Sequence, residues 1–283
     1  MTAPAKVTSG RVALVTGASS GIGEATARRL AQRGYTTYAA ARRISRMDAL
    51  RDQGIHTVPV DVTDDTSLIA LVEQVIAESG RIDVLVNNAG YGSYGALEDV
   101  PIAEARRQFD VNIFGMGRLI QLVLPHMRAQ HDGYIVNISS VGGKMWEPMG
   151  SWYHATKFAV EGLSDSLRAE VAAFGIKVIV IEPGAIRTEW SAIAADHLDA
   201  ISASTAYRDQ AALVSGMLRA GYSRTASEPS AVANAIARAV ERSRPRTRYA
   251  VGGWARSLLL VNRILTDRAF DRFLRLTYRA IGS

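Results

Sequence analysis

The 283-residue chain contains no cysteine. This absence excludes disulfide bridges, thiolate catalysis and cysteine-based metal sites, and we predict no metal site of any kind. A chain without disulfides also fits a reducing compartment.

Long apolar runs are missing as well. No segment reaches the roughly 18 consecutive apolar residues that a membrane-spanning helix needs. Residues 1–10 lack the apolar core of a secretory signal peptide, and we expect them to form a flexible tail. These absences together predict a cytoplasmic protein.

Aromatic residues are few, at 7% of the chain, and they do not alternate with basic residues as in a nucleic-acid platform. We therefore predict no nucleic-acid partner. The net charge of +6 is unevenly placed, because residues 254–283 carry six Arg against two Asp. A basic patch of this kind is typical of proteins that contact anionic ligands or membrane surfaces.

What the sequence does have is a glycine-rich turn between a strand and a helix. The apolar run Val12–Thr16 predicts a buried strand, and residues 24–31 have a helix-forming composition. A turn in this setting favours a dinucleotide, because glycines let the backbone approach a pyrophosphate at a helix N-terminus. The residues of this predicted cofactor turn are Gly17, Ser19, Ser20, Gly21, Ile22 and Gly23.

Further apolar runs alternate with helical patterns along the chain. The runs are 35–41, 55–60, 82–86, 133–138, 176–181 and 247–251. Strands that alternate with helices indicate a parallel sheet with right-handed crossovers. The sequence predicts an α/β fold, a Rossmann-type doubly wound sheet in one domain over residues 11–253, with a helical C-terminal extension over 254–283.

The second strand ends in Arg42 and Arg43, about where an acid would bind the ribose of NAD. Two guanidinium groups suit the 2′-phosphate of NADP instead, so we predict NADP(H). The alternative is that both arginines simply start a solvated helix.

Other strand ends carry further candidates for the cofactor site, because the carboxyl ends of parallel strands share one edge of the sheet. The carboxylate of Asp61 could meet an adenine amino group, or it could be only a turn residue. Asn112 lies inside a helical stretch predicted over 101–128, where it could be a core residue with satisfied hydrogen bonds. The remaining cofactor candidates are Val62, Asn88, Ala89, Gly90, Pro183, Gly184, Ile186 and Thr188.

Tyr153 and Lys157 stand at i and i+4 of a predicted helix that runs to about Phe174. They therefore lie on one helix face. A fixed ammonium one turn away favours the phenolate, so we expect Lys157 to lower the pKa of Tyr153. Ser140, upstream, can orient a substrate oxygen. Tyr–Lys pairs also occur on ordinary solvated helix faces, so the pair alone is weak evidence.

The whole set of motifs resembles the short-chain dehydrogenase/reductase superfamily. The matching pieces are Thr16–Gly23, Asn87–Gly90, Asn112, Ser140, Tyr153–Lys157 and Pro183–Thr188, in the order and spacing of that family. Beyond Thr188 the likeness weakens, although the tail is closer to the steroid- and retinoid-type reductases than to the acyl-carrier-protein reductases.

The resemblance implies roles for four residues. Tyr153 would be the catalytic acid and base, and Lys157 would bind the nicotinamide ribose. Ser140 would hold the substrate carbonyl, and Asn112 would anchor a water that leads protons to Lys157. A homo-oligomer is also implied. One departure concerns Ser20, where many NADP-dependent members carry a basic residue, and it leaves Arg42 and Arg43 to decide the cofactor.

The substrate pocket is expected between the 140–153 loop and a lid-like segment over about 189–222, which could equally be a surface helix pair. Apolar and thioether side chains favour a lipophilic substrate such as a steroid, a retinoid, an acyl chain or a bulky ketone. The predicted substrate contacts are Ser140, Met145, Trp146, Tyr153 and Trp190.

The basic C-terminal segment has four open interpretations. It could lie on an anionic membrane, cover the pocket, form a subunit contact or pack in the ordinary way. For the whole chain we predict an NADP(H)-dependent oxidoreductase that interconverts a carbonyl and an alcohol. The alternatives are a non-catalytic NADP(H) sensor and, less favoured, a dehydratase or epimerase on a related fold.

Overall fold

The apolar runs form one parallel sheet of seven strands in the computed structural model, which describes residues 10–282 without the side chains of 220–225 and 279–282. The predicted flexible tail thus lies outside the described residues, apart from Gly10. The strands are β1 Val12–Thr16, β2 Thr36–Ala41, β3 His56–Pro59, β4 Val84–Asn87, β5 Gly133–Ile138, β6 Ile176–Pro183 and β7 Arg248–Val251.

The strand order is β3-β2-β1-β4-β5-β6-β7, and every neighbouring pair is parallel. Along β1, Leu14 faces one helix layer while Ala13 and Val15 face the other. Strands buried on both faces are apolar throughout rather than alternating, which explains the continuous apolar runs in the sequence. The order reverses between β1 and β4, and that reversal opens a crevice for ligands at the carboxyl ends of the strands.

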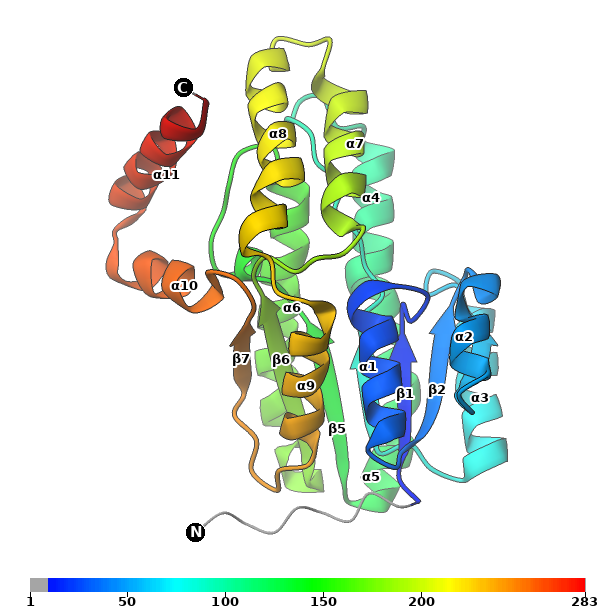
Figure 1. Cartoon of the computed structure of the whole chain (residues 1–283). Coiled ribbons are helices and arrows are strands. Elements are labelled where there is room, and N and C mark those ends of the chain that lie inside the picture. The colour runs from blue at the N-terminus through cyan, green and yellow to red at the C-terminus, as the bar shows by residue number, and fades with distance from the viewer. Residues whose placement is uncertain (1–9, 283) are drawn as a thin grey trace.

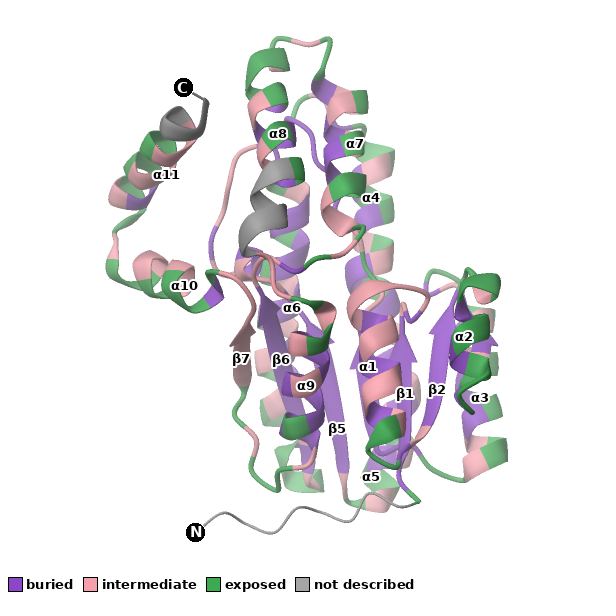
Figure 2. Ribbon diagram, viewed as in Figure 1, coloured by how far each residue is buried: buried purple, intermediate pink, exposed green. Residues whose placement is uncertain are grey.

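Helices cover both faces of the sheet, and their inner faces are buried (Figures 1 and 2). One layer packs α1 Gly21–Gln32, α2 Asp48–Arg51 and α9 Pro229–Val240 on the sheet. The other packs α3 Asp65–Ser79, α5 Gly115–Gln130 and α6 Ser151–Val171. The predicted doubly wound Rossmann-type fold is therefore confirmed.

The helix predicted over residues 101–128 is interrupted. It consists of α4 Ile102–Phe109, a π-helical turn over Asp110–Phe114, and then α5. A π-helical turn widens the backbone spiral by one residue and is frequent at functional sites. Here it contains Asn112.

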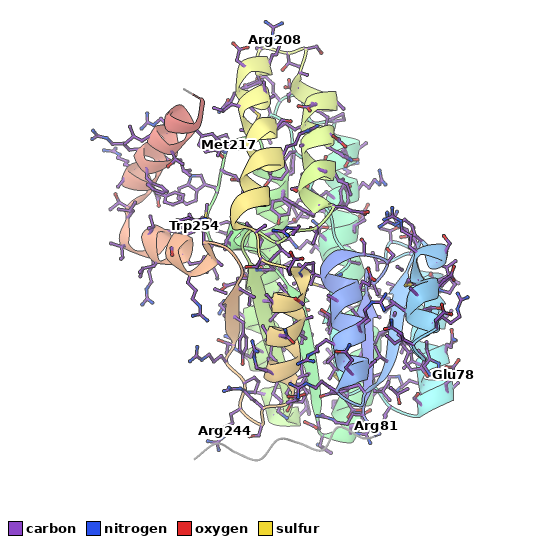
Figure 3. All side chains as sticks on the ribbon, in the orientation of Figure 1. Glu78, Arg81, Arg208, Met217, Arg244 and Trp254 are labelled. Carbon is purple, nitrogen blue, oxygen red and sulfur yellow. The ribbon has the colours of Figure 1, made fainter. Side chains whose placement is uncertain are left out.

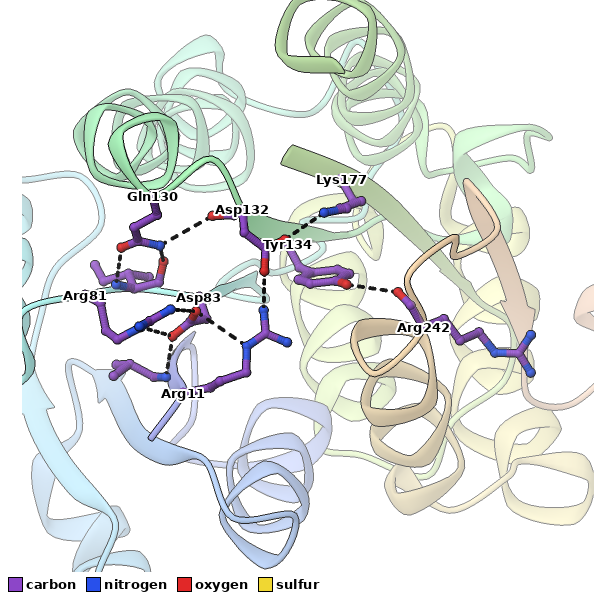
Figure 4. A network of polar contacts seen from close by, with 10 residues as sticks. Arg11, Arg81, Asp83, Gln130, Asp132, Tyr134, Lys177 and Arg242 are labelled. Atoms are coloured by element: carbon purple, nitrogen blue, oxygen red, sulfur yellow. Dashed lines mark hydrogen bonds and ion pairs between the residues drawn. The ribbon is translucent and has the colours of Figure 1, made fainter. Parts of the chain in front are cut away.

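At the end of the sheet away from the crevice, charged residues form a network of hydrogen bonds and ion pairs (Figure 4). Asp83 is fully buried and accepts hydrogen bonds from the Arg81 and Arg11 guanidinium groups and from the Val12 amide. Arg11 also pairs with Asp132 at 3.0 Å. This network ties the starts of β1, β4 and β5 together, so it stabilises the scaffold at the end remote from the crevice.

Two helix pairs extend the sheet domain beyond the crevice (Figure 1). The first is α7 Trp190–Ser202 with α8 Arg208–Thr225, whose inner faces bury Leu198, Val214 and Leu218. The second is α10 Ala255–Ile264 with α11 Asp267–Gly282. Within the described part of the chain, no helix combines the length and the hydropathy that a membrane crossing requires.

Candidate active site

The glycine turn after β1 adopts the conformation that its sequence predicts. Gly17 has φ +65°, which favours glycine. A Cβ on Gly23 would lie only 2.4 Å from the Gly17 carbonyl oxygen, so Gly23 permits close packing of α1 beneath the turn and does not itself line the cavity. The other five predicted residues of the turn do line the cavity.

The loop after β4 is fastened directly to this turn. The Asn88 side chain donates to the carbonyls of Thr16 at 3.0 Å and Gly17 at 3.2 Å. The Thr16 hydroxyl in turn accepts from the amides of Asn88 and Ala89, both at 3.1 Å. Asn88 therefore holds the walls of the crevice together, and its neighbours Ala89 and Gly90 line the cavity beside it.

Two arginines border the adenosine end of the predicted cofactor site. Arg43 donates to the hydroxyls of Ser19 and Ser20, both at 3.3 Å, from the end of β2. Arg42 lies near Asp61, whose pKa burial would raise, but hydrogen bonds from Thr63 and the positive charge of Arg42 lower it overall. No acid stands at the end of β2, where Ala41 lines the cavity, so these residues fit a 2′-phosphate.

The opposite wall of the cofactor region comes from the segment after β6. Pro183, Gly184, Ile186 and Thr188 all line the cavity, as predicted from their position after the strand. Val62, after β3, lines it as well.

Tyr153 is buried at the centre of the cavity, with 6% of its surface exposed. Burial raises the pKa of its phenol; a hydrogen bond with Ser140 lowers the pKa, and the Glu147 carboxylate raises it further. The net direction is upward, so the prediction of a lowered Tyr153 pKa is wrong. The physical reason is that burial of the phenolate outweighs the single favourable hydrogen bond.

Lys157 lies against the same phenol ring, with Nζ 5.9 Å from the Tyr153 ring centroid. Nζ donates to the Ile138 carbonyl oxygen at 2.9 Å. Burial lowers the pKa of Lys157 to about 8, although nearby Glu161 opposes the shift. The ammonium form therefore still predominates at neutral pH.

Asn112 does not reach the cavity. Its amide donates to the Tyr91 carbonyl at 3.0 Å and to the Thr156 hydroxyl at 3.1 Å, and its oxygen accepts from the Tyr91 amide at 3.1 Å. The π-helical turn thus fixes the loop after β4 against α6. This contact set fits the alternative of a satisfied core Asn, and the proton-relay role remains a prediction.

His154, which sequence reasoning did not single out, shapes the loop that carries Ser140. Its Nδ1 lies 2.9 Å from the Gly142 carbonyl, and its Nε2 lies 3.1 Å from the Glu147 amide. Since a carbonyl only accepts and an amide N–H only donates, the ring is neutral with its proton on Nδ1. His154 therefore holds both halves of the loop above Tyr153.

One cavity of about 1570 Å³ runs from the glycine turn past Tyr153 to the extension helices. Its outer part is mainly apolar, with side chains from the 140–153 loop, α7, α8 and α10. These are Met145, Trp190, Ile193, Leu213, Met217, Leu218 and Leu258. Figure 3 labels two lining residues of the cavity, Met217 on α8 and Trp254 just before α10.

Trp146 is not a lining residue, which corrects the prediction that it contacts substrate. Its ring packs on Phe270 of α11 with centroids 5.0 Å apart, and its Nε1 donates to Asp271 at 3.1 Å. Neighbouring residues of an extended loop point in opposite directions, so Met145 faces the cavity while Trp146 faces α11. The fold of α11 over this loop could not be read from the sequence.

The polar cavity residues that sequence reasoning missed include Tyr94, Glu147 and Tyr278. The Glu147 carboxylate accepts from the Tyr94 hydroxyl at 2.9 Å and from the Tyr278 hydroxyl at 3.4 Å. Glu147 lay within the loop already identified as pocket-forming, and a lone acid among Met and Trp residues was the available indication. Among the described residues, no cluster of His, Asp or Glu could hold a metal ion.

Comparisons with known proteins agree with this geometry. The family model for the short chain dehydrogenases matches residues 11–198. The probable short-chain type dehydrogenase/reductase VdlC of Helicobacter pylori is 33% identical over 265 residues, which cover 94% of this chain and 97% of that one. A crystal structure of a short-chain dehydrogenase from Streptomyces avermitilis is 35% identical, with a TM-score of 0.78 and coverage of 96% and 98%.

Two relatives have names that state a reaction. A 3-ketodihydrosphingosine reductase from Bacteroides thetaiotaomicron is 44% identical over 178 residues, which cover 63% of this chain and 65% of that protein. An NADPH-dependent 3-dehydrocapnine reductase from Ornithobacterium rhinotracheale is 37% identical over 188 residues, which cover 63% and 66%. The matches thus span just under two thirds of both relatives.

Solved relatives contain both forms of the cofactor. A metagenomic short-chain oxidoreductase in complex with NADP is 28% identical, with a TM-score of 0.68 and coverage of 86% and 97%. A 3-ketoacyl-(acyl-carrier-protein) reductase from Brucella melitensis with NADH is 26% identical, with a TM-score of 0.72 and coverage of 85% and 96%. With its sheet, glycine turn and buried Tyr–Lys pair, this chain belongs to the short-chain dehydrogenase/reductase family and is an oxidoreductase.

Proposed function

We propose that the protein is an NADP(H)-dependent reductase that interconverts a carbonyl and an alcohol on a lipophilic substrate. The observation that carries this proposal is the single cavity in which the Ser140–Tyr153 pair lies between the glycine turn and an apolar outer chamber. The two relatives named as reductases support the reaction class.

The chain's own residues account for the proton chemistry. Tyr153 has a raised pKa, so it is protonated at neutral pH and ready to donate to a carbonyl oxygen. Ser140 stands beside it and can donate a second hydrogen bond as negative charge grows on that oxygen. Lys157, one helical turn away, supplies a buried positive charge that favours the phenolate once Tyr153 has lost its proton.

The cofactor supplies the hydride. The residues that would hold it are the glycine turn, the Asn88–Gly90 loop and the segment from Pro183 to Thr188. Lys157 would exchange its bond to the Ile138 carbonyl for the ribose hydroxyls. Arg42 and Arg43 would bind a 2′-phosphate, and Arg43 is well placed because its present partners are two neutral hydroxyls and a Glu189 carboxylate 3.9 Å away.

The C-terminal helices suggest where a lipophilic substrate enters. Leu258, Thr277 and Tyr278 line the cavity from one side of the α10–α11 pair. On exposed positions of the same pair lie Arg256, Arg263, Arg268, Arg272 and Arg275, with Leu260, Ile264 and Leu276. Exposed arginines interleaved with exposed apolar residues favour an anionic bilayer surface, and we propose that α10 and α11 rest on one. Arg279 lies outside the described side chains.

A homo-oligomer stays part of the proposal, as the family resemblance implies. Phe114 and Phe158, which lie at the α5 junction and on α6, are exposed at 63% and 45%. Large exposed aromatic side chains are enriched in subunit contacts. Size-exclusion chromatography with light scattering would measure the mass directly, and a monomer at micromolar concentration would contradict this point.

The decisive experiment measures oxidation of NADPH and NADH against a panel of long-chain ketones, steroids, retinals and bulky aromatic ketones. Tyr153→Phe is the control, because it removes the acid but not the ring that packs in the cavity. We expect turnover of at least one lipophilic carbonyl, with kcat at least 10²-fold lower in the variant. Tight NADPH binding without turnover across the panel would contradict the reductase and favour a sensor.

A further inference from the structure

The Glu147 carboxylate stands in an apolar part of the cavity wall. Glu147 lines the same cavity as the apolar side chains of Met145, Trp190 and Leu218. Its two oxygens are held separately, Oε1 by the Tyr94 hydroxyl at 2.9 Å and Oε2 by the Tyr278 hydroxyl at 3.4 Å. These donors come from the loop after β4 and from α11, so the carboxylate is fixed from two sides and faces the chamber.

No described cation neutralises this charge. The ion pairs of the described residues include none to Glu147, whereas the buried Glu161 on the far side of the loop pairs with Lys144 at 3.1 Å and Arg248 at 2.9 Å. His154 offers no proton there, because its Nε2 accepts from the Glu147 amide. The two neutral phenols donate hydrogen bonds to the carboxylate but do not neutralise its charge. A carboxylate in an apolar setting is strongly stabilised by a bound cation.

The carboxylate is also close to the reacting groups. Tyr94, which donates its hydroxyl to Glu147, packs a tilted ring against the Tyr153 ring with centroids 5.6 Å apart. The negative charge of Glu147 acts on the Tyr153 phenol and raises its pKa. A cation bound at Glu147 would cancel that effect, so binding would ease proton donation from Tyr153.

We propose that Glu147 binds an ammonium group carried by the substrate near the reacting carbonyl, which makes the substrate a long-chain amino ketone. This inference rests on the proposed reductase function and adds the substrate class to it. The apolar chamber takes the chain, the Ser140–Tyr153 pair takes the carbonyl, and Glu147 takes the amine. A lipophilic ketone without an amine leaves the Glu147 charge uncompensated.

The test compares two substrates that differ only in the amine: a 2-amino-3-ketone with a chain of about 12–16 carbons and the same ketone with hydrogen in place of the amino group. We expect wild-type kcat/KM to favour the amino ketone by about 10- to 100-fold, the range of a charge-assisted hydrogen bond. In Glu147→Gln, which keeps the shape and an acceptor oxygen, that preference falls at least tenfold.

A matched control is Glu98→Gln. Glu98 also accepts a tyrosine hydroxyl, Tyr207 at 3.0 Å, but it is exposed and outside the cavity. This variant should keep the wild-type preference. If kcat/KM falls equally for both substrates in Glu147→Gln, then Glu147 only holds Tyr278 and α11 in place. If the preference for the amino ketone is unchanged, then Glu147 does not contact the amine. Either result overturns the proposal.

A binding measurement separates this inference from the reductase proposal. Isothermal titration of octylammonium and of octanol into the NADPH-loaded protein reports the ammonium site without any turnover. We expect octylammonium to bind at least tenfold more tightly than octanol in the wild type, and with similar affinity in Glu147→Gln. Turnover of plain ketones without this preference would overturn the ammonium site alone. The preference without turnover of any carbonyl would overturn the reductase alone.

Discussion

Tyr153 is subject to two opposing influences, since burial disfavours its phenolate while Ser140 favours it. Which influence prevails could not be predicted from the spacing of Tyr153 and Lys157, because the sequence shows neighbours but not the depth of burial. Nearly all predicted cofactor residues line the cavity because they follow strand ends, which the sequence locates well. The prediction that Trp146 contacts substrate was wrong because a loop side chain can face either way. Glu147 was missed for the same reason.

At the residue scale, the first prediction concerns the arginines after β2. Replacing Arg42 and Arg43 with Ala should raise KM for NADPH by about 10- to 100-fold, because charge-assisted bonds to a phosphate are lost. KM for NADH should change less than threefold. Arg51→Ala, an exposed guanidinium on α2 paired with Asp48, serves as the control. An equal rise in KM for NADPH and NADH would refute the 2′-phosphate assignment.

Glu182 provides a pH-dependent prediction. Burial and the nearby Glu161 charge raise its pKa from 4.5 to about 7, against the attraction of Arg248 and Lys144. A raised carboxyl pKa means that ionisation costs the folded state more than the unfolded state, so the cost is absent below pH 4.5 and complete above pH 7. Glu182→Gln should therefore be more stable than wild type at pH 8, by about 2–4 kcal/mol.

Urea unfolding at pH 4.5, 6 and 8 measures this difference. The gain of the variant should be smallest at pH 4.5 and should grow with pH. A gain that is constant across the three values would show that the ionisation of Glu182 is not its source.

At the scale of elements, the strands were predicted most accurately because a strand buried on both faces must be apolar throughout. The predicted runs at β1 and β5 have the bounds that the structure shows. The π-helical turn at Asn112 was not predicted, and the bond of Asn112 to the Tyr91 backbone, 21 residues away, is a contact that local sequence does not show. In the 189–222 segment, α7 and α8 form a helix pair that lines the cavity, and the lid-like role stays a prediction.

Phe270 is the fully buried residue of α11 that packs on Trp146, and the hydrogen bonds of Asp271 and Tyr278 also hold this helix. Truncation of a buried Phe usually costs about 3–5 kcal/mol, but Phe270 packs outside the sheet core. We therefore expect Phe270→Ala to release α11 locally, raise KM for lipophilic substrates by about tenfold and leave the melting temperature of the sheet domain nearly unchanged. Limited proteolysis and steady-state kinetics would check this.

Phe174→Ala is the matched control, because Phe174 is partly exposed at the end of α6, away from the cavity. If Phe270→Ala lowers the melting temperature strongly without altering KM, then α11 is part of the core and does not act as a separate wall.

At the scale of the whole molecule, the two ends of the sheet carry different groups of charged residues. One end carries the Asp83 network, and the other carries the cavity and the basic α10–α11 pair. The sequence indicated the basic segment but could not decide among membrane contact, pocket cover and subunit contact. Leu258, Thr277 and Tyr278 of this segment line the cavity, and its exposed face carries the arginines.

Charge reversal tests the proposed bilayer contact. Changing Arg263, Arg268 and Arg272 to Glu should abolish flotation with vesicles of anionic lipid, because each basic residue near the surface contributes about 1 kcal/mol. The control is the same change at Arg242, Arg244 and Arg246, exposed near the opposite end (Arg244 is labelled in Figure 3). Loss of flotation in both triple variants would indicate net charge alone, and its absence in the wild type would refute the contact.

The cavity wall is assembled from segments as far apart as Gly17 and Tyr278. Contacts of such long range form late when a chain refolds, because loop closure opposes them. The glycine turn and the Asn88 loop belong to the sheet, whereas α11 docks on a sheet that already exists. On dilution from denaturant, the fluorescence of bound NADPH should therefore return before turnover does, and the delay between the two would time the closing of the apolar chamber.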